Sequence, residues 1–286
     1  RGPGVVVRVS FRDRGGAARA VLQRVFPEPL YRPIPAESAG LRGLVVGRDA
    51  DVLSAQFDAA GIAVRHDDVV GALIDVLSPK GLIVRNDTAI RAIEGLPPQA
   101  ATEHGEIGQP VELLENGLVF LADLSEGQKT GWFYDQRVNR AAVAAVAKGG
   151  RVLDVYCYLG GFGMNAAAGG ASNVTFVDRS AAALELAAEA AKRNGFAERC
   201  NFERSEAFGY LEAALKAGER WNVVVVDPPA FVPRPAAALI VPEAVGADCI
   251  VQGAPCPGDR PGQAPSDPGP RVPAGQGGVR VASRGA

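Results

Sequence analysis

Acidic residues recur in this sequence at the ends of apolar segments that predict β-strands. Asp154 belongs to the first segment, Asp178 ends the second, and Glu206 and Asp227 follow the third and fourth. In an open α/β sheet, ligands bind outside the carboxyl ends of the parallel strands, and an acid about 20 residues beyond the first strand is placed to bind ribose hydroxyls. Asp178 has that position, and Glu206 is placed to accept a hydrogen bond from an adenine amino group. The four acids together predict a nucleoside site.

Two adjacent glycines, Gly160 and Gly161, occupy the loop between the first of these strands and the next helix. Missing side chains let a phosphate or a sulfonium nucleoside approach the backbone, or let two elements pack tightly. The loop has neither the G-x-G-x-x-G spacing of dinucleotide sites nor the lysine of a Walker loop. A ribose-binding acid without a phosphate cradle favours a nucleoside cofactor that lacks pyrophosphate, and S-adenosylmethionine fits that description.

Each of these signals also has a structural interpretation. The glycine pair would serve close packing alone, Asp178 would cap a helix, and Glu206 would be a solvated residue at a helix start. Their order at successive strand ends favours the binding site, because four independent structural features would rarely fall into that order by chance.

The elements that position these residues alternate between strand and helix from residue 136 onward. The expected strands are 152–156, 174–178, 201–203 and 223–226, and the expected helices are 136–147, 161–168, 180–194 and 206–217. Residues 223–226 form a continuous β-branched run, which is typical of a strand buried on both faces of a parallel sheet. The alternation predicts a doubly wound, Rossmann-like α/β sheet.

A small α+β domain is expected in front of this sheet, over residues 27–122, after an irregular N-terminal segment 1–26. Its expected elements are a hairpin over 43–57, a helix over 67–77 capped by Asp67 or Asp68, a strand at 82–84, a loop over 95–110 and a hairpin turning at Asn116-Gly117. Residues 123–231 are then the cofactor-binding domain, expected to be incomplete because its sheet stops after four strands.

Residues 232–286 have a different composition. Of these 55 residues, 10 are proline and 9 are glycine, a proportion typical of low-complexity or disordered sequence. A slip of the reading frame near residue 232 would also produce this composition. Arg1 in place of methionine suggests that the chain is a fragment.

Four segments carry a resemblance to a known family: GQKTGWFYDQRVNR at 127–140, VLDVYCYLGGFGMNAA at 152–167, VTFVDRSAAALELAAEAAKRNG at 174–195 and VVVVDPPAF at 223–231. With them, the chain resembles the RlmI-like class I methyltransferases over about residues 27–231. The resemblance implies S-adenosylmethionine as cofactor and 5-methylcytosine in large-subunit ribosomal RNA as product. It places Asp154, Gly160, Gly161, Asp178, Glu206 and Asp227 at the methyl-donor pocket.

The same resemblance implies an RNA site beside the donor. Lys129 and Arg137 are expected to contact RNA phosphate, Gln128 the donor or the base, and Phe231 the substrate, with Asp227 as the catalytic residue that hydrogen-bonds the target cytosine. Trp132, Phe133 and Tyr134 would either stack on an unpaired base or pack the two domains together at a loop-to-helix junction.

The resemblance also leaves a gap in the mechanism. The family places a nucleophilic cysteine in a Ser-Cys-Ser-like segment on a later strand, and residues 232–286 contain no such segment. Carbon-5 of cytosine needs a thiolate at carbon-6 to become reactive. Two alternatives therefore stay open: a methyltransferase acting on an amino group through DPPAF, which needs no cysteine, and a remnant that binds the cofactor without catalysis.

Composition limits the remaining possibilities. The formal net charge is −2, so any RNA-binding surface must be local. No apolar run approaches a membrane span, the four cysteines lack metal-ligand spacing, and scattered free thiols suit a cytoplasmic protein. We therefore expect no membrane and no metal, while the oligomeric state stays open.

Overall fold

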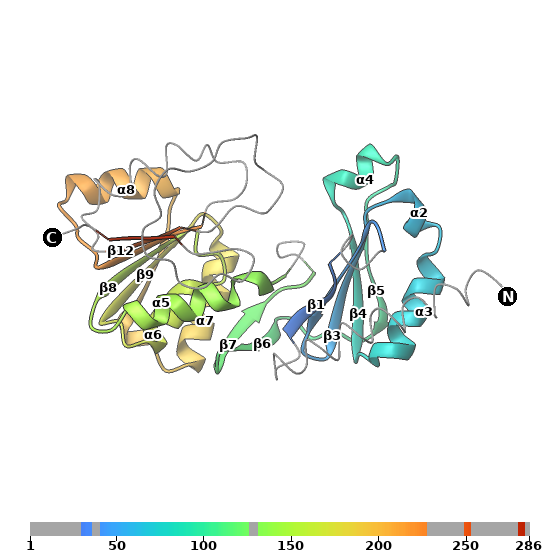
Figure 1. Cartoon of the computed structure of the whole chain (residues 1–286), viewed down its shortest axis with the longest axis horizontal. Coiled ribbons are helices and arrows are strands. Elements are labelled where there is room, and N and C mark those ends of the chain that lie inside the picture. Colours follow the sequence, from blue (N-terminus) through green and yellow to red (C-terminus); the bar gives the residue numbers. More distant parts are fainter. Residues whose placement is uncertain (1–29, 36–40, 126–130, 228–248, 253–279, 284–286) are drawn as a thin grey trace. The chain divides into compact units, whose positions relative to one another are not determined.

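The computed structural model describes residues 30–35, 41–125, 131–227, 249–252 and 280–283. The chain divides into two compact units, which are described separately (Figure 1). Unit 1 comprises residues 1–115 and 121–134, and unit 2 comprises residues 116–120 and 135–286.

Unit 1 is built on a five-stranded sheet in the order β1-β2-β3-β4-β5. Its elements are β1 (Leu30–Pro35), β2 (Leu44–Asp49), β3 (Val52–Phe57), α2 (Ala60–Ala63), α3 (His66–Leu77), β4 (Gly81–Asn86), α4 (Ala89–Ile93) and β5 (Gln99–Gly105). Neighbouring strands are antiparallel except β3 and β4, which run parallel because α2 and α3 connect them. The predicted hairpin, helix and strand are therefore present.

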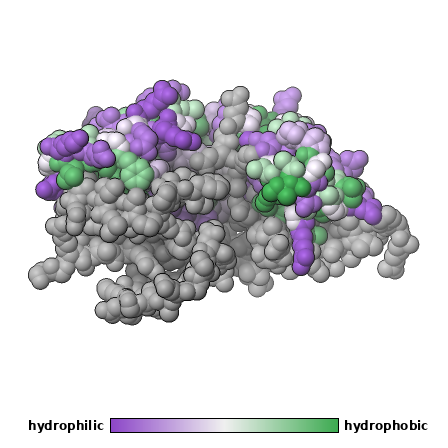
Figure 2. Space-filling view, turned by 90° about the horizontal axis from the view of Figure 1, so that it is seen from above, coloured by the Kyte–Doolittle hydropathy of each residue, from purple (hydrophilic) through white to green (hydrophobic). Residues whose placement is uncertain are grey.

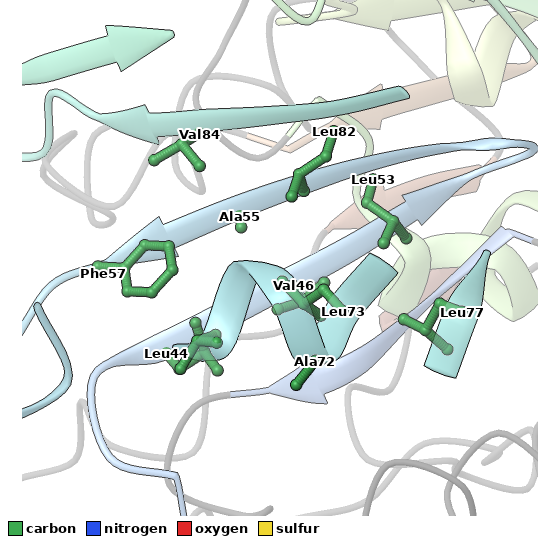
Figure 3. Packing of buried hydrophobic residues seen from close by; sticks show 11 residues of the cluster. Leu44, Val46, Leu53, Ala55, Phe57, Ala72, Leu73, Leu77, Leu82 and Val84 are labelled. Carbon is green, nitrogen blue, oxygen red and sulfur yellow. The ribbon is translucent and has the colours of Figure 1, made fainter. Parts of the chain in front are cut away.

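The core of unit 1 lies between the sheet and α3. Alternate residues of β2, β3 and β4 point toward the helix, as the period of two in a strand requires. Figure 3 shows these side chains against Ala72, Leu73 and Leu77 of α3. All eleven residues of the cluster are at most 2% exposed, so α3 is fixed by its apolar stripe.

Two local expectations for unit 1 were wrong. The loop expected over 95–110 contains β5, an edge strand whose mostly polar residues are exposed on one side and therefore lack an apolar pattern. Helix α3 begins at His66 with Arg65 as its N-cap residue, and no side chain caps it, so Asp67 and Asp68 lie within its first turn.

Exposed apolar side chains gather at one end of unit 1. Val64, Ile90 and Ile93 are 79%, 55% and 84% exposed and come from the end of α2 and from α4. Figure 2 shows apolar surface in this part of the molecule.

Among the described helices, none combines the length and apolar character needed to cross a membrane.

Unit 2 is a three-layer α/β structure with a six-stranded sheet in the order β10-β9-β8-β11-β12-β13. Its elements are α5 (Arg137–Val146), β8 (Arg151–Val155), α6 (Gly161–Ala168), β9 (Asn173–Asp178), α7 (Ala181–Arg193), the 3₁₀ turn η3 (Ala197–Arg199), β10 (Cys200–Arg204), α8 (Ala207–Lys216), β11 (Val223–Val226), β12 (Cys249–Gln252) and β13 (Arg280–Ser283); a 3₁₀ turn, η2 (Tyr134–Gln136), precedes α5. Helix α8 covers one face, and α5, α6 and α7 lie on the other (Figure 1). The predicted Rossmann-like fold is confirmed.

The strands of unit 2 are buried on both faces. Leu153 and Val155 of β8 pack with α8 in one apolar cluster, whereas Val152 and Asp154 alternate to the opposite face. Strands β8 to β12 are parallel, so their carboxyl ends share one edge, and only β13 is antiparallel. This edge is the one at which the predicted site residues meet.

The sequence suggested that the sheet stops after four strands, and this expectation was wrong. Residues 249–252 pair with β11 along its whole length, and residues 280–283 pair with β12. Both strands are only four residues long and are surrounded by proline and glycine, which conceal them in the composition. The apolar segment Cys249-Ile250-Val251 is the signal that the compositional argument overlooked.

The division between the units runs through a hairpin. Strands β6 (Val111–Glu115) and β7 (Leu118–Ala122) form a two-stranded sheet that turns at Asn116-Gly117, with φ values of 53° and 75°. Positive φ at both residues is the type I′ geometry that favours Asn-Gly. Residues 116–120 belong to unit 2 and residues 121–134 to unit 1, whereas the sequence suggested one boundary after residue 122.

Candidate functional site

The loop after β8 has an unusual backbone. Tyr156, Tyr158 and Gly160 have φ values of 62°, 50° and 76°, so every second residue is left-handed. That conformation costs a non-glycine residue on the order of 1–3 kcal/mol and is concentrated at functional sites. Surrounding hydrogen bonds hold the loop: the Cys157 amide donates to the Val177 carbonyl, and the Gly160 amide donates to the Cys157 carbonyl.

Asp154 lies beneath this loop and is 1% exposed. Its Oδ2 accepts a hydrogen bond from the Gly163 amide at 2.8 Å, which ties β8 to the first turn of α6. Burial raises the pKa of Asp154 to about 7; the Gly163 N–H and Arg140 oppose the shift, and Asp227 and Asp178 add to it. These couplings show that three of the predicted acids lie close together.

Asp178 closes the loop from the end of β9. Its Oδ2 accepts from the Tyr158 amide at 2.9 Å, and its Oδ1 accepts from the Ser180 amide at 2.9 Å. Ser180 in turn caps α7, because its Oγ accepts from the Ala183 amide at 3.2 Å. Asp178 therefore has a structural function in the loop, while its contact with a ribose stays a prediction.

Glu206 is the N-cap residue of α8. Its Oε2 accepts from the amides of Phe208 and Gly209 at 2.9 and 3.2 Å, and the side chain is exposed. The structural interpretation of this acid, a solvated helix start, thus describes its contacts. Burial and then Glu206 raise the pKa of Tyr156, which places the carboxylate near the loop after β8.

Asp227 follows β11, the strand that pairs with β8 on the side away from β9. Burial raises its pKa, the positive charge of Arg140 opposes the shift, and Asp135 adds to it. Arg140 is 3% exposed on α5, and its Cζ lies 5.8 Å from the centroid of the Phe162 ring. A buried cation thus serves both Asp227 and Asp154.

Glycines in the loop and in the first turn of α6 make room for a protein side chain. A Cβ on Gly163 would lie 2.3 Å from Cε1 of Phe176, and one on Gly160 would lie 3.0 Å from the same atom. Phe176 is stacked on Phe202, with ring centroids 4.7 Å apart, so it has little freedom to retreat. Close packing therefore accounts for Gly160, one of the two predicted glycines, and for Gly163 in α6, whereas the contact of Gly160 and Gly161 with the methyl donor stays a prediction.

Of the four residues predicted to contact RNA, the structure describes only Arg137. Gln128, Lys129 and Phe231 lie outside the described residues. Arg137 is described and is 7% exposed at the start of α5, so a phosphate contact by its guanidinium would need local opening. That contact stays a prediction.

The aromatic residues after the GQKTG segment are anchored within unit 1. Trp132 is 1% exposed, and its Nε1 donates to Glu115 at 2.8 Å. The hydroxyl of Tyr134 donates to Oδ1 of Asp49 at 2.5 Å. Phe133 is the exposed member of the three. Trp132 therefore has a packing function, and Phe133 is the ring of the three that reaches the surface.

The cysteines with a described position are poorly suited to nucleophilic chemistry at this edge. Burial raises the pKa of the Cys157 thiol well above its ordinary value, and burial raises that of Cys200 to about 11. Cys249 pairs with Val223, the first residue of β11, so its backbone lies at the amino end of the sheet. Cys256 lies outside the described residues.

Sequence reasoning missed Arg140 and Asn165, two buried polar residues beside the site. Both lie on predicted helices, α5 and α6, and no local pattern in the sequence distinguishes them from solvent-exposed polar residues. Among the described residues, no three His, Cys, Asp or Glu side chains are grouped so as to hold a metal ion.

The arrangement defines a class of protein. The five parallel strands of unit 2 have the order β10-β9-β8-β11-β12, with acids at successive carboxyl ends and a glycine loop after β8. This arrangement is typical of a Rossmann-like nucleotide-binding fold. The family model for S-adenosylmethionine-dependent methyltransferases matches residues 94–239. The chain belongs to this family, whose methyl donor is S-adenosylmethionine.

Known proteins support this assignment. The chain is 40% identical over 204 residues to ribosomal RNA large subunit methyltransferase I of Aeromonas hydrophila, which covers 70% of this chain and 51% of that protein. The chain thus spans about half the length of the curated relatives it matches.

Solved structures resemble the chain in fold. One from Streptococcus mutans, classed as a SAM-dependent methyltransferase, has a TM-score of 0.76 at 20% identity and covers 88% of this chain and 68% of its own. Another, classed as a methyltransferase and complexed with SAH, has a TM-score of 0.74 at 20% identity over 86% of this chain and 67% of its own. Identities this low support the fold alone.

Proposed function

We propose that this chain transfers the methyl group of S-adenosylmethionine to large-subunit ribosomal RNA and forms 5-methylcytosine. The observation that carries the proposal is the 40% identity over 204 residues to a ribosomal RNA large subunit methyltransferase. The meeting of Asp154, Asp178 and Asp227 at one sheet edge supports it, because acids at the carboxyl ends of parallel strands are placed to bind a nucleoside cofactor. We also propose a cytoplasmic location, where ribosomal RNA is accessible.

The residues fit the cofactor in this arrangement. When bound, S-adenosylmethionine supplies an activated methyl group on a sulfonium centre. Asp178 would accept from the ribose hydroxyls and Glu206 from the adenine amino group, as carboxylates at the ends of the second and third strands do. Asp154 would hold the glycine loop through the Gly163 amide.

Asp227 has the properties of the residue that faces the target base. Burial raises its pKa, so its carboxyl group retains a proton more readily than an exposed acid does. A protonated Asp227 would donate to N3 of cytosine while a thiolate adds at carbon-6. Carbon-5 would then form a bond to the donated methyl group as the sulfonium–methyl bond breaks. A base would take the carbon-5 proton, the thiolate would leave carbon-6, and N3 would return its proton to Asp227. Cys256, four positions after the end of β12 in the sequence, is the cysteine to test as that nucleophile.

The test is methyl transfer by the purified full chain from radiolabelled S-adenosylmethionine to unmodified large-subunit ribosomal RNA, followed by nucleoside analysis. We expect 5-methylcytidine from the wild type. Asp227→Asn should reduce the rate at least a hundredfold, in the range of a lost general acid. Glu212→Gln, which removes an exposed acid of α8 outside the site, is the matched control and should retain the wild-type rate.

The other outcomes separate the alternatives. A methylated exocyclic amine, with full activity in Cys256→Ser, would establish the amino-group methyltransferase, which the unsuitable pKa values of Cys157 and Cys200 favour. Binding of S-adenosylmethionine without transfer to any RNA would establish a cofactor-binding remnant. Either result overturns the formation of 5-methylcytosine.

A further inference from the structure

Two asparagines connect the hairpin turn between β6 and β7 to the glycine loop. Nδ2 of Asn116 donates to Oδ1 of Asn165 at 3.0 Å, and Nδ2 of Asn165 donates to the Gly161 carbonyl at 2.8 Å. Nδ2 of Asn116 also lies 3.4 Å from the carbonyl of Arg137, at the start of α5. All of these residues belong to unit 2. The contacts run from the turn to Gly161, the first residue of α6, which directly follows Gly160 at the end of the loop.

The geometry of this relay is well defined. Asn165 is 2% exposed, and its amide uses both of its ends in the relay. Asn116 sits at the left-handed position of a type I′ turn, where asparagine is favoured, so the backbone fixes the direction of its side chain. A buried amide that is satisfied at both ends by named partners rigidifies its surroundings.

We propose that Asn116 and Asn165 are positioning residues for cofactor binding: through the Gly161 carbonyl they hold the glycine loop in its binding conformation. The inference rests on the proposed function, because it assigns these residues to the S-adenosylmethionine site. The three left-handed residues of the loop, Tyr156, Tyr158 and Gly160, make external support necessary. Asp154 and Asp178 support the loop from the sheet, and the two asparagines support it from the helix side.

The effect on binding follows from preorganisation. A loop that is already ordered loses little entropy when the ligand binds, whereas a loosened loop must be ordered at the expense of affinity. Neither asparagine needs to touch the cofactor for this. Their removal should therefore weaken cofactor binding, and it should also increase exchange at the loop amides before any ligand is present.

Asn194 provides a matched control. It is the C-cap residue of α7, and it also binds the hairpin segment of unit 2: its Oδ1 accepts from the Val119 amide at 3.0 Å, and its Nδ2 donates to the Val119 carbonyl at 2.7 Å. Within the described part of the chain, its side chain makes no hydrogen bond to the loop between Tyr156 and Gly163. Asn194→Ala thus loosens the same hairpin segment without touching the relay.

The experiment uses the full chain and calorimetric titration with S-adenosylmethionine. We expect Asn165→Ala to raise the Kd about five- to tenfold, the range for the loss of one or two hydrogen bonds. Asn116→Gly, which retains the left-handed turn and removes only the side chain, should raise it about threefold. Asn194→Ala should change it less than about twofold, even where thermal stability falls equally. The double variant Asn116→Gly/Asn165→Ala should resemble Asn165→Ala alone, because both residues act through one relay.

Hydrogen exchange of the chain without ligand distinguishes positioning of the loop by the asparagines from a general stabilising effect. The relay predicts faster exchange of the amides from Tyr158 to Gly163 in Asn165→Ala and Asn116→Gly than in Asn194→Ala. Equal exchange in all three, or equal changes in Kd, would overturn the relay and leave the asparagines as stabilising residues only. A third outcome is that the wild-type chain does not bind S-adenosylmethionine, while Asn165→Ala and Asn116→Gly still exchange faster than Asn194→Ala. That outcome would support the positioning of the loop and overturn the proposed function. Since Asn116 is exposed, its variant gives a result even if Asn165→Ala does not fold.

Discussion

The ends of β8 and β10 carry the same signature in the sequence and very different environments in the structure. At β8, Asp154 is 1% exposed and holds a strained loop through one backbone amide. At β10, Glu206 is exposed and caps α8 through two amides. The comparison shows that an acid at a strand end can be a buried group with a shifted pKa or an ordinary helix cap. Burial, which the local sequence does not specify, makes the difference.

The largest effect is expected at Asp154. Its pKa in the folded chain is about 7, raised from 3.8, so between pH 4 and 7 the folded chain binds a proton there that the unfolded chain has lost. This group therefore makes stability fall as the pH rises through that window, by up to about 1.4 kcal/mol per pH unit. Asp154→Asn retains an acceptor for the Gly163 amide and removes the titration.

The measurement is the free energy of unfolding in urea at several pH values from 5 to 8. The difference between Asp154→Asn and the wild type should grow with pH in favour of the variant and level off above about pH 7. Glu212→Gln, at an exposed position, should follow the wild type. Parallel curves for Asp154→Asn and the wild type would show that Asp154 titrates normally.

The next effect concerns the loop that the buried acid holds. Gly163→Ala would place a Cβ 2.3 Å from the Phe176 ring, and overpacking of this kind costs about 1–3 kcal/mol. Thermal or urea unfolding measures the loss. Phe176→Leu in the same chain should restore part of it. Gly209→Ala in α8 is the control: nothing lies within 4 Å of its Cβ position, so it should stabilise the helix by about 0.5–1 kcal/mol. A stable Gly163→Ala would mean that the ring can move.

A smaller effect is expected at the exposed acid. Glu206→Ala removes the acceptor for two amides of α8 and should cost about 1 kcal/mol of stability, the usual value for an N-cap. Glu206→Gln keeps an acceptor oxygen and should lose less. Titration with S-adenosylmethionine tests the second function of this residue: a weaker affinity in Glu206→Ala, beyond that of an equally destabilised variant, would support the adenine contact.

The smallest effect is expected at Ser180, which caps α7 without charge. Ser180→Ala loses one hydrogen bond of 3.2 Å and should cost about 0.5–1 kcal/mol. Its affinity for S-adenosylmethionine should be unchanged, which makes it the reference for Glu206→Ala. A change of affinity in Ser180→Ala would indicate that Asp178, whose Oδ1 accepts from the Ser180 amide, moves with the cap.

The sequence predicted most of the fold of unit 2, because β8, β9 and β11 contain apolar runs and α7 and α8 begin with recognisable capping residues. Ser180 as the cap of α7 is an example that the structure confirms. Prediction from the sequence failed where pairing with a neighbouring strand decides whether a segment forms a strand. β5 is a polar edge strand that pairs with β4, and the short segments β12 and β13 pair with β11 and β12.

The site was only partly predictable for a related reason. Asp154, Asp178 and Asp227 were found because strand ends converge by topology. Arg140 and Asn165 were missed because their importance arises from burial between α5, α6 and the sheet, which no local pattern reports. The packing function of Gly163 likewise depends on Phe176, a residue of the neighbouring strand.

The hairpin at the division of the units has a consequence for how this gene can be cut or recombined. The chain passes from one unit to the other after residues 115, 120 and 134, so neither unit is a continuous stretch of sequence. A gene fragment starting at residue 123 would lack Asn116 and Val119, which unit 2 binds through Asn165 and Asn194. A crossover between residues 116 and 134 during homologous recombination would combine segments of both units from two parent genes. We therefore expect functional recombinants to inherit residues 116–134 from one parent.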